Sequence, residues 1–152
     1  MNNFEKSILD FIAQHNTMSL STVSDEGLPC SASLFYVNNG FIFYFVSSIS
    51  SLHSRNIASR PLVSITINKD YSDWRLVRGL QMRGRVTEVS EVESVKVVSL
   101  YFEKYEFINE FLNDGNISDD IRFYKVIPEI IRYIDNTREF GHKEEIKTYH
   151  LS

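Results

Sequence analysis

The fold class rests on residues 30–46, which read CSASLFYVNNGFIFYFV. Two apolar segments, Cys30–Val37 and Phe41–Val46, flank the short polar run Asn-Asn-Gly at 38–40. Asn and Gly both tolerate the positive φ angles that tight turns between antiparallel strands require. Strands are commonly bounded by such turn residues. The sequence therefore predicts a β-hairpin here.

Alternating apolar and polar residues on both sides of this hairpin predict further strands. They lie at 18–23, 63–67, 76–89, 121–127 and 130–134, the last two being separated by Pro128-Glu129. Within the long strand 76–89, Gly79 and Gly84 are expected to mark bulges or points where another backbone approaches closely.

Apolar residues at helical spacing predict helices at 4–15, from Ser50 or Ser51 to about 60, from 91 to about 105, and over 107–112. Ser90 and Glu93 have the spacing of a capping box before the third helix. The last eighteen residues are polar and predicted to be irregular. About seven strands joined by short turns indicate a mostly β (α+β) fold, an antiparallel barrel forming a single domain over 1–152.

The composition argues against several classes of function. A net charge of −4 is unlike that of proteins that bind nucleic acid broadly through Lys and Arg. The single cysteine, Cys30, cannot form an intrachain disulfide. No metal site is expected, because no carboxylate or thiolate stands at ligand spacing from the histidines at 15, 53, 142 and 150. Without a signal peptide or a long apolar run, the chain is expected to be cytoplasmic and to make no membrane contact.

Residues 47–56, SSISSLHSRN, form the first candidate site. They follow an apolar strand and run into a predicted helix, whose first N–H groups suit a phosphate. Serine hydroxyls add donors, His53 can donate from its ring, and Arg55 offers a planar fork for phosphate oxygens. Serine clusters more often mark plain surface loops. These residues alone therefore leave two interpretations open, a phosphate site and a solvated loop with a helix cap.

Two other polar segments are weaker candidates. In the arginine-rich strand at 75–85, a binding role requires Arg78 or Gln81 to point into a pocket, and an outward-facing charged strand is the alternative. The tail at 135–143, DNTREFGHK, has the composition of a turn. It could instead fold over a site and supply Lys143.

The order of these motifs resembles the FMN-binding split-barrel superfamily, the group that includes pyridoxamine 5′-phosphate oxidase. The segments that carry the resemblance are GLPCSASLFY (27–36), GFIFYFVS (40–47), SLHSRNI (51–57) with Pro61, and RGLQMRG (78–84). The chain is most similar to the uncharacterised YhbP-like branch, with which it shares the last of these segments and the ending DNTREFG (135–141).

The resemblance implies a six-stranded split barrel that forms a homodimer with FMN in each interface cleft. Along the isoalloxazine ring it places Ser31, Ala32, Ser33 and Leu34. Around the phosphate and ribityl chain it places Ser47, Ser51, His53, Arg55 and Asn56, and near the polar edge of the ring Arg78 and Gln81, or Lys143. Many relatives have Lys where His53 stands, which predicts a weaker hold on the phosphate.

Two classes of function follow from the resemblance. In the first, the protein is a flavin-dependent oxidoreductase that passes hydride or electrons between NADH or NADPH and a small molecule. In the second, it is a non-catalytic binder of flavin, haem or another flat cofactor, since no acid–base pair is evident in the sequence. The tail lacks the Trp and Arg of the true oxidase, which argues against oxidation of pyridoxamine phosphate itself.

Overall fold

The computed structural model describes residues 1–114 and 118–148. Its strands are β1 (Thr17–Val23), β2 (Pro29–Phe35), β3 (Val37–Asn39), β4 (Ile42–Ser48), β5 (Leu62–Asn68), β6 (Arg78–Glu88), β7 (Ile121–Asp135) and β8 (Lys143–Lys147). Its α-helices are α1 (Asn3–Ala13), α2 (Leu52–Ser59), α3 (Glu91–Lys104) and α4 (Ile108–Asn113), and a short 3-10 helix spans Trp74–Leu76.

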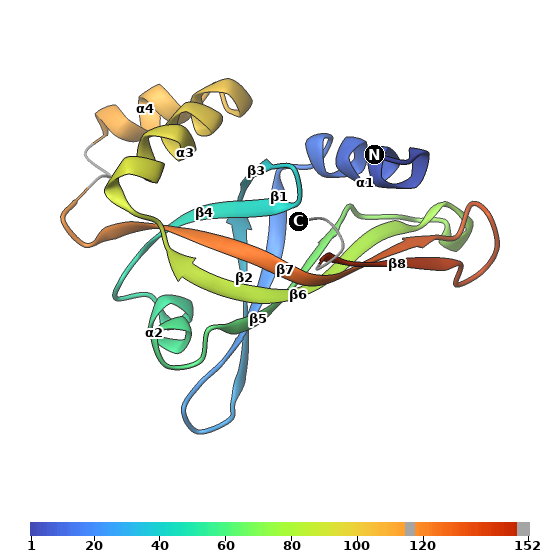
Figure 1. The fold of residues 1–152 in the computed structure, drawn as a ribbon, viewed down its shortest axis with the longest axis horizontal. Coiled ribbons are helices and arrows are strands. Elements are labelled where there is room, and N and C mark those ends of the chain that lie inside the picture. Colours follow the sequence, from blue (N-terminus) through green and yellow to red (C-terminus); the bar gives the residue numbers. More distant parts are fainter. Residues whose placement is uncertain (115–117, 149–152) are drawn as a thin grey trace.

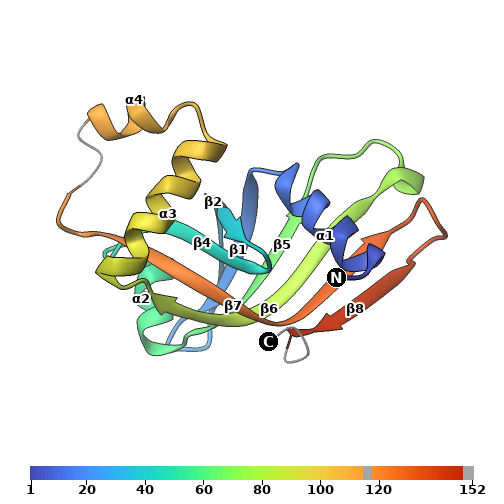
Figure 2. The ribbon, with the colours of Figure 1, turned by 45° about the horizontal axis from the view of Figure 1, so that its top comes forward.

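One eight-stranded antiparallel sheet curls into a split barrel (Figure 1). The strand order is β2-β1-β5-β6-β7-β4-β3, and β8 pairs with β7 outside this path. The strand β2 at one edge also contacts β4 near the other edge. The helices α1 and α2 lie at opposite ends of the sheet in both views (Figures 1 and 2).

The inner face of the sheet is apolar because alternate residues of each strand point to the same side. On β6, Leu80, Met82 and Val86 are buried, whereas the side chains between them are exposed. The helix α1 contributes Ile8 and Ile12, which are fully buried in the same core. The barrel interior is therefore filled by side chains.

The helices α3 and α4 form a second core against β3 and β4. Its buried members are Val37, Tyr44, Val97, Tyr101, Tyr105 and Ile108. The hydroxyl of Tyr105 donates to the carbonyl of Asn16 at 2.9 Å, which ties α3 to the segment between α1 and β1. This part of the chain thus packs on the side of the barrel formed by β3 and β4.

The predicted hairpin is only partly confirmed. Val37–Asn39 pairs with Ile42–Tyr44, and Gly40 between them has a φ of +58°. The segment before it does not continue this pairing, because Pro29–Phe35 pairs with β1 instead. The chain changes partners at Tyr36, which is fully buried and whose hydroxyl donates to the carbonyl of Ile12 at 2.6 Å.

Three other expectations about strands are wrong. The segments 121–127 and 130–134 form one continuous strand, β7, which runs through Pro128. The polar tail contains a strand, β8, at Lys143–Lys147. The sheet consequently has eight strands in place of the six implied by the resemblance.

The predicted helix caps and the predicted bulge agree better with the structure than the predicted strand boundaries do. Ser51 caps α2, and Ser90 caps α3 by accepting the N–H of Glu93 at 3.2 Å. The second half of the predicted capping box does not form, since the Glu93 carboxylate binds Lys125 at 2.9 Å and accepts from the Tyr44 hydroxyl at 3.0 Å. Gly84 stands at the β-bulge between β6 and β7, as predicted.

Some expectations concern absences. In the parts of the chain that the structure describes, no helix is long and apolar enough to cross a membrane. Across residues 1–114 and 118–148, no group of three or more His, Cys, Asp or Glu side chains could hold a metal ion. The helix predicted over 107–112 should end at Asp114-Gly115, of which Gly115 lies outside the described residues, as does His150.

Candidate functional site

The segment after β4 folds into a hydroxyl cluster, which we call the serine loop (residues 47–56). The Ser47 Oγ lies 2.7 Å from Nε2 of His53 and 3.1 Å from the Ser51 Oγ. The Ser51 Oγ also accepts the backbone N–H of Ser54 at 3.3 Å, which caps α2. Three predicted phosphate-binding side chains, those of Ser47, Ser51 and His53, therefore meet at the N-terminus of α2.

His53 is the most buried titratable group of the serine loop. Its ring packs edge-on against Phe45, with ring centroids 6.3 Å apart. Burial lowers the pKa of the imidazole below its ordinary value of 6.5, because the charged form is poorly solvated there. His53 is therefore neutral at pH 7 and offers a hydrogen bond, without a charge, to a ligand.

Replacing His53 with Gln should make stability less dependent on pH between about 5 and 7. The unfolded chain takes up a proton on this residue near pH 6.5, whereas the folded chain does so only at lower pH. Stability that is complete above this range is therefore lost as the pH falls. Urea unfolding at several pH values measures the effect. An equally steep decline in the variant would contradict the role given to His53.

Arg55 and Asn56 point to different sides of α2. Arg55 is exposed, and its side chain makes no ion pair or hydrogen bond with the described residues. Asn56 is only 6% exposed, and its Nδ2 donates to Thr22 Oγ1 on β1 at 3.0 Å. Asn56 thus does not lie with the predicted phosphate-binding residues, because the helical period turns it inward, where it fastens α2 to the barrel.

The predicted ring-binding residues alternate along β2. Ser31 and Ser33 point outward in register with Ser21 and Ser19 of β1, and the Oγ atoms of Ser31 and Ser21 are 3.1 Å apart. Ala32 and Leu34 point toward the core. The helix α2 contacts β2 as well as β1. The serine loop and the strand β2 therefore border the same part of the barrel.

Polar side chains, most of them small hydroxyls, continue across the outer face of the sheet. One row aligns Ser33, Ser19, Thr66, Gln81 and Arg132, and the next aligns Ser31, Ser21, Ser64 and Arg83. Within the first row, Nη1 of Arg132 donates to Oε1 of Gln81 at 3.5 Å. Sequence reasoning missed Thr66 and Arg132, because alternation predicts the face of a strand and leaves its register open.

Arg78 and Lys143 lie at the end of the sheet that is far from the serine loop. Arg78 begins β6 opposite Asp135, and Lys143 begins β8 opposite Ile134. Arg78 lies on the inner side with Leu80, whereas Gln81 lies on the outer face. A single chain therefore does not bring Arg78, Gln81 and Lys143 together with the serine loop.

Comparison with known protein families agrees with this architecture. The family model described as pyridoxamine 5′-phosphate oxidase matches residues 4–135. The chain is 23% identical over 135 residues to the UPF0306 protein of Klebsiella pneumoniae (strain 342), across 88% of this chain and 86% of that protein.

Solved structures share the fold. A haem binding protein from Mycobacterium smegmatis has a TM-score of 0.81 at 16% identity, over 98% of this chain and 60% of that one. The haem storage protein HutZ from Vibrio cholerae has a TM-score of 0.70 at 23% identity, over 82% of this chain and 89% of that one. At such identities the likeness concerns the fold alone. With the family match over most of its length, this split-barrel chain belongs to the pyridoxamine 5′-phosphate oxidase family.

Proposed function

We propose that the chain is a cytoplasmic, homodimeric FMN-binding protein that acts as a flavin-dependent oxidoreductase on a small molecule. The observation that carries the proposal is the serine loop. Its hydroxyls meet at the start of α2, and Arg55, which makes no ion pair with the described residues, stands one helical turn further on.

These residues fit the phosphate of FMN. The Ser51 hydroxyl donates to the Ser48 carbonyl at 2.8 Å, so the donors offered to an anion are the Ser47 hydroxyl and the first N–H groups of α2, with their favourable dipole. Arg55 supplies the positive charge that the neutral His53 does not. The phosphate grip thus combines one cation with several neutral donors.

The isoalloxazine ring would lie along β2, beside the outward hydroxyls of Ser31 and Ser33. The outer face of the sheet carries Gln81 on a polar surface, with Thr66 and Arg132 beside it. A second copy packed on this face would bring its own Gln81 to the ring, which one chain cannot do for itself. The homodimer is therefore part of the proposal.

When bound, FMN supplies hydride or electron transfer. The chain's contribution is to hold and orient the ring, and no side chain need act as a nucleophile. The serine loop contains no acidic residue, which is consistent with a role in binding the cofactor.

The second candidate function is haem binding, favoured by the two haem proteins of similar fold. A haem iron needs an accessible ligand, usually an imidazole. In the serine loop, Nε2 of His53 is 2.7 Å from the Ser47 hydroxyl. In the described part of the chain, Nδ1 of His15 is likewise 2.7 Å from the Phe11 carbonyl, and Nε2 of His142 is 3.1 Å from Arg138. Each bond occupies one nitrogen of its ring and leaves the other for a metal, so the histidines alone do not separate haem from flavin, and binding measurements are needed.

Titration of the purified protein with FMN, riboflavin and haem separates the candidates. The wild type should bind FMN more tightly than riboflavin, because only FMN carries the phosphate. Arg55→Gln should weaken FMN binding by about 10- to 100-fold, as expected for a charged hydrogen bond of roughly 1.5–3 kcal/mol. It should leave riboflavin binding unchanged. Arg60→Gln, at the other end of α2, is the matched control and should behave as the wild type.

Two outcomes would contradict the proposal. Equal affinity for FMN and riboflavin would remove the phosphate from the serine loop, and a Soret band with no uptake of FMN would favour the haem candidate. If FMN binds, its bleaching by NADH or NADPH without oxygen supports an oxidoreductase. Persistent colour with both donors supports a passive flavin binder.

A further inference from the structure

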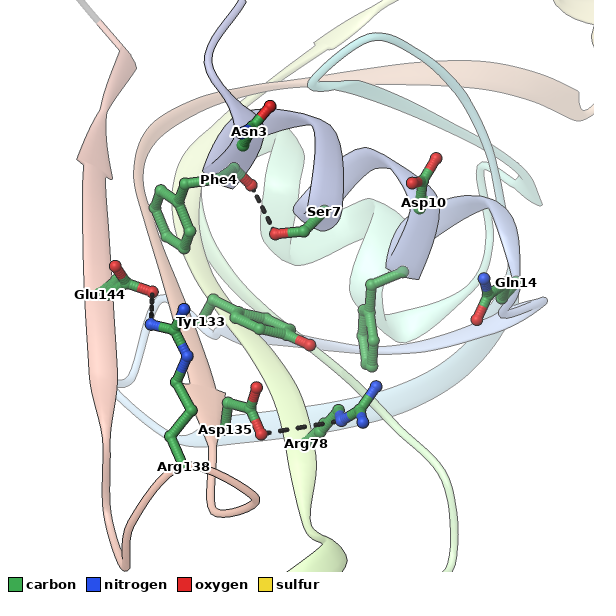
Figure 3. A pocket seen from close by; sticks show the side chains of 11 residues that line it. Asn3, Phe4, Ser7, Asp10, Gln14, Arg78, Tyr133, Asp135, Arg138 and Glu144 are labelled. Carbon is green, nitrogen blue, oxygen red and sulfur yellow. Dashed lines mark hydrogen bonds and ion pairs between the residues drawn. The ribbon is translucent and has the colours of Figure 1, made fainter.

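A second candidate site lies at the end of the barrel that is far from the serine loop. A cavity of about 550 Å³ opens between α1 and the strands β6, β7 and β8 (Figure 3). This volume falls within the range of small-molecule sites. Arg78 and two residues of the DNTREFG ending, Asp135 and Arg138, line it. The proposed FMN site uses none of these three.

Aromatic rings form one wall of this cavity. The Tyr133 ring packs edge-on against Phe11 with centroids 5.4 Å apart, and the Phe4 ring lies 6.5 Å from it. Tyr133 is only 7% exposed, and its ring lies between the two arginines in Figure 3. Phe11 is only 6% exposed, so the partly exposed Phe4 ring offers most of the aromatic surface that a ligand body can contact.

Arg78 is the cation in this cavity with the most unused hydrogen-bonding capacity. Its Nε is 3.7 Å from Oδ1 of Asp135, which is beyond hydrogen-bond distance. The same Asp135 oxygen already accepts the backbone N–H of Thr137 at 3.0 Å. Arg138, in contrast, donates to the Glu144 carboxylate at 3.2 Å. Arg78 therefore has N–H groups available for an anion.

The turn after β7 holds these groups in place. The Asn136 Nδ2 donates to the carbonyl of Trp74 at 2.8 Å, and its Oδ1 accepts the N–H of Gly141 at 2.9 Å. Gly141 has a φ of +73°, a conformation that favours glycine. The ending DNTREFG thus builds a fixed turn between β7 and β8 at the mouth of the cavity.

We propose that this cavity binds a small molecule that carries a single carboxylate on an aromatic or aliphatic body. The carboxylate pairs with the Arg78 guanidinium, and the body packs on Phe4 and the exposed edge of Tyr133. A dianion such as phosphate is disfavoured, because Asp135 and Glu144 also line the cavity. A cation is disfavoured too, because the positive charges of Arg78 and Arg138 line the same cavity, and Asp10 points away from Tyr133 and Arg78 in Figure 3.

Calorimetric titration of the flavin-free protein with benzoate and hexanoate tests this site. Benzyl alcohol, benzamidine and phenyl phosphate serve as neutral, cationic and dianionic probes. Benzoate or hexanoate should bind with a dissociation constant in the millimolar range or below, and the other three at least about tenfold more weakly. Arg78→Gln should weaken carboxylate binding at least about tenfold, and Arg78→Lys should restore part of it.

The matched control is Arg75→Gln. Arg75 is an exposed arginine of the same segment, and it pairs with Asp73 at 2.9 Å. It should bind carboxylates as the wild type does. Unchanged binding in Arg78→Gln, preference for benzamidine, or no binding of either carboxylate would overturn the proposal. Carboxylate binding is measured on protein without flavin, so this result does not depend on the flavin proposal.

Discussion

Replacing Gly84 with Ala should lower the free energy of unfolding by about 3 kcal/mol, at the upper end for overpacking in a well-packed interior. A Cβ atom at this position would stand 2.5 Å from the carbonyl oxygen of Ile127 and 3.0 Å from Cα of Pro128. Both are backbone atoms of the neighbouring strand β7, so relief requires the two strands to move apart. Urea unfolding of the two proteins, with the slope compared as well as the midpoint, measures the loss.

Gly79, on the same strand, provides the control. A Cβ atom there would lie 3.6 Å from the Ile67 carbonyl oxygen and 3.7 Å from Cβ of Asn68, which are ordinary contacts. Gly79→Ala should change the stability by less than about 1 kcal/mol. Equal losses in the two variants would mean that the close approach at the bulge does not determine the cost.

Truncation of Phe45 to Ala should destabilise the protein by about 3–5 kcal/mol, the range for a large ring removed from a core. Phe45 is fully buried in β4. Its ring stacks on Tyr124 with centroids 5.0 Å apart and an interplanar angle of 17°. The Phe45 ring also packs against the His53 ring of the serine loop. Phe45→Ala should therefore weaken FMN binding as well.

Phe140→Ala is the comparison for Phe45→Ala, because that ring is 79% exposed in the turn between β7 and β8. Its loss should stay within about 1 kcal/mol, as is usual for exposed positions. Thermal unfolding of both variants provides the measurement. A loss below about 2 kcal/mol for Phe45→Ala would show that the core around β4 collapses readily into the space left by the ring.

Local sequence signals predicted much of the fold. Ser51 and Ser90 were expected to begin helices, and each accepts a backbone N–H of the first helical turn. Pro128 misled the prediction of β7, since proline lacks the N–H that a strand interior uses. It fits because it stands opposite Gly84 at the bulge, where the ladder is already interrupted. The strand β8 was missed because its sequence, KEEIK, contains one apolar residue, Ile146.

The part of the candidate site formed by residues close together in the sequence was predictable. Ser47, Ser51 and His53 lie within seven residues, and the turn before α2 brings them together. The outer row that contains Gln81 and Arg132 joins strands far apart in the chain, and only their register reveals it. Alternation could not show that Arg78 faces a cavity, because α1 forms the opposite wall.

The position of β7 between β6 and β4 bears on synthesis of the protein at the ribosome. The strand β4 pairs with β3 over a short stretch and with β7 along most of its length. Its apolar residues, such as Phe43 and Phe45, therefore emerge more than seventy residues before the strand that covers them. During this interval the nascent chain exposes an aromatic strand with one unpaired edge, of the kind that chaperones recognise. Barrel closure awaits residues 121–135, so release of a chain ending before them should yield an aggregation-prone fragment.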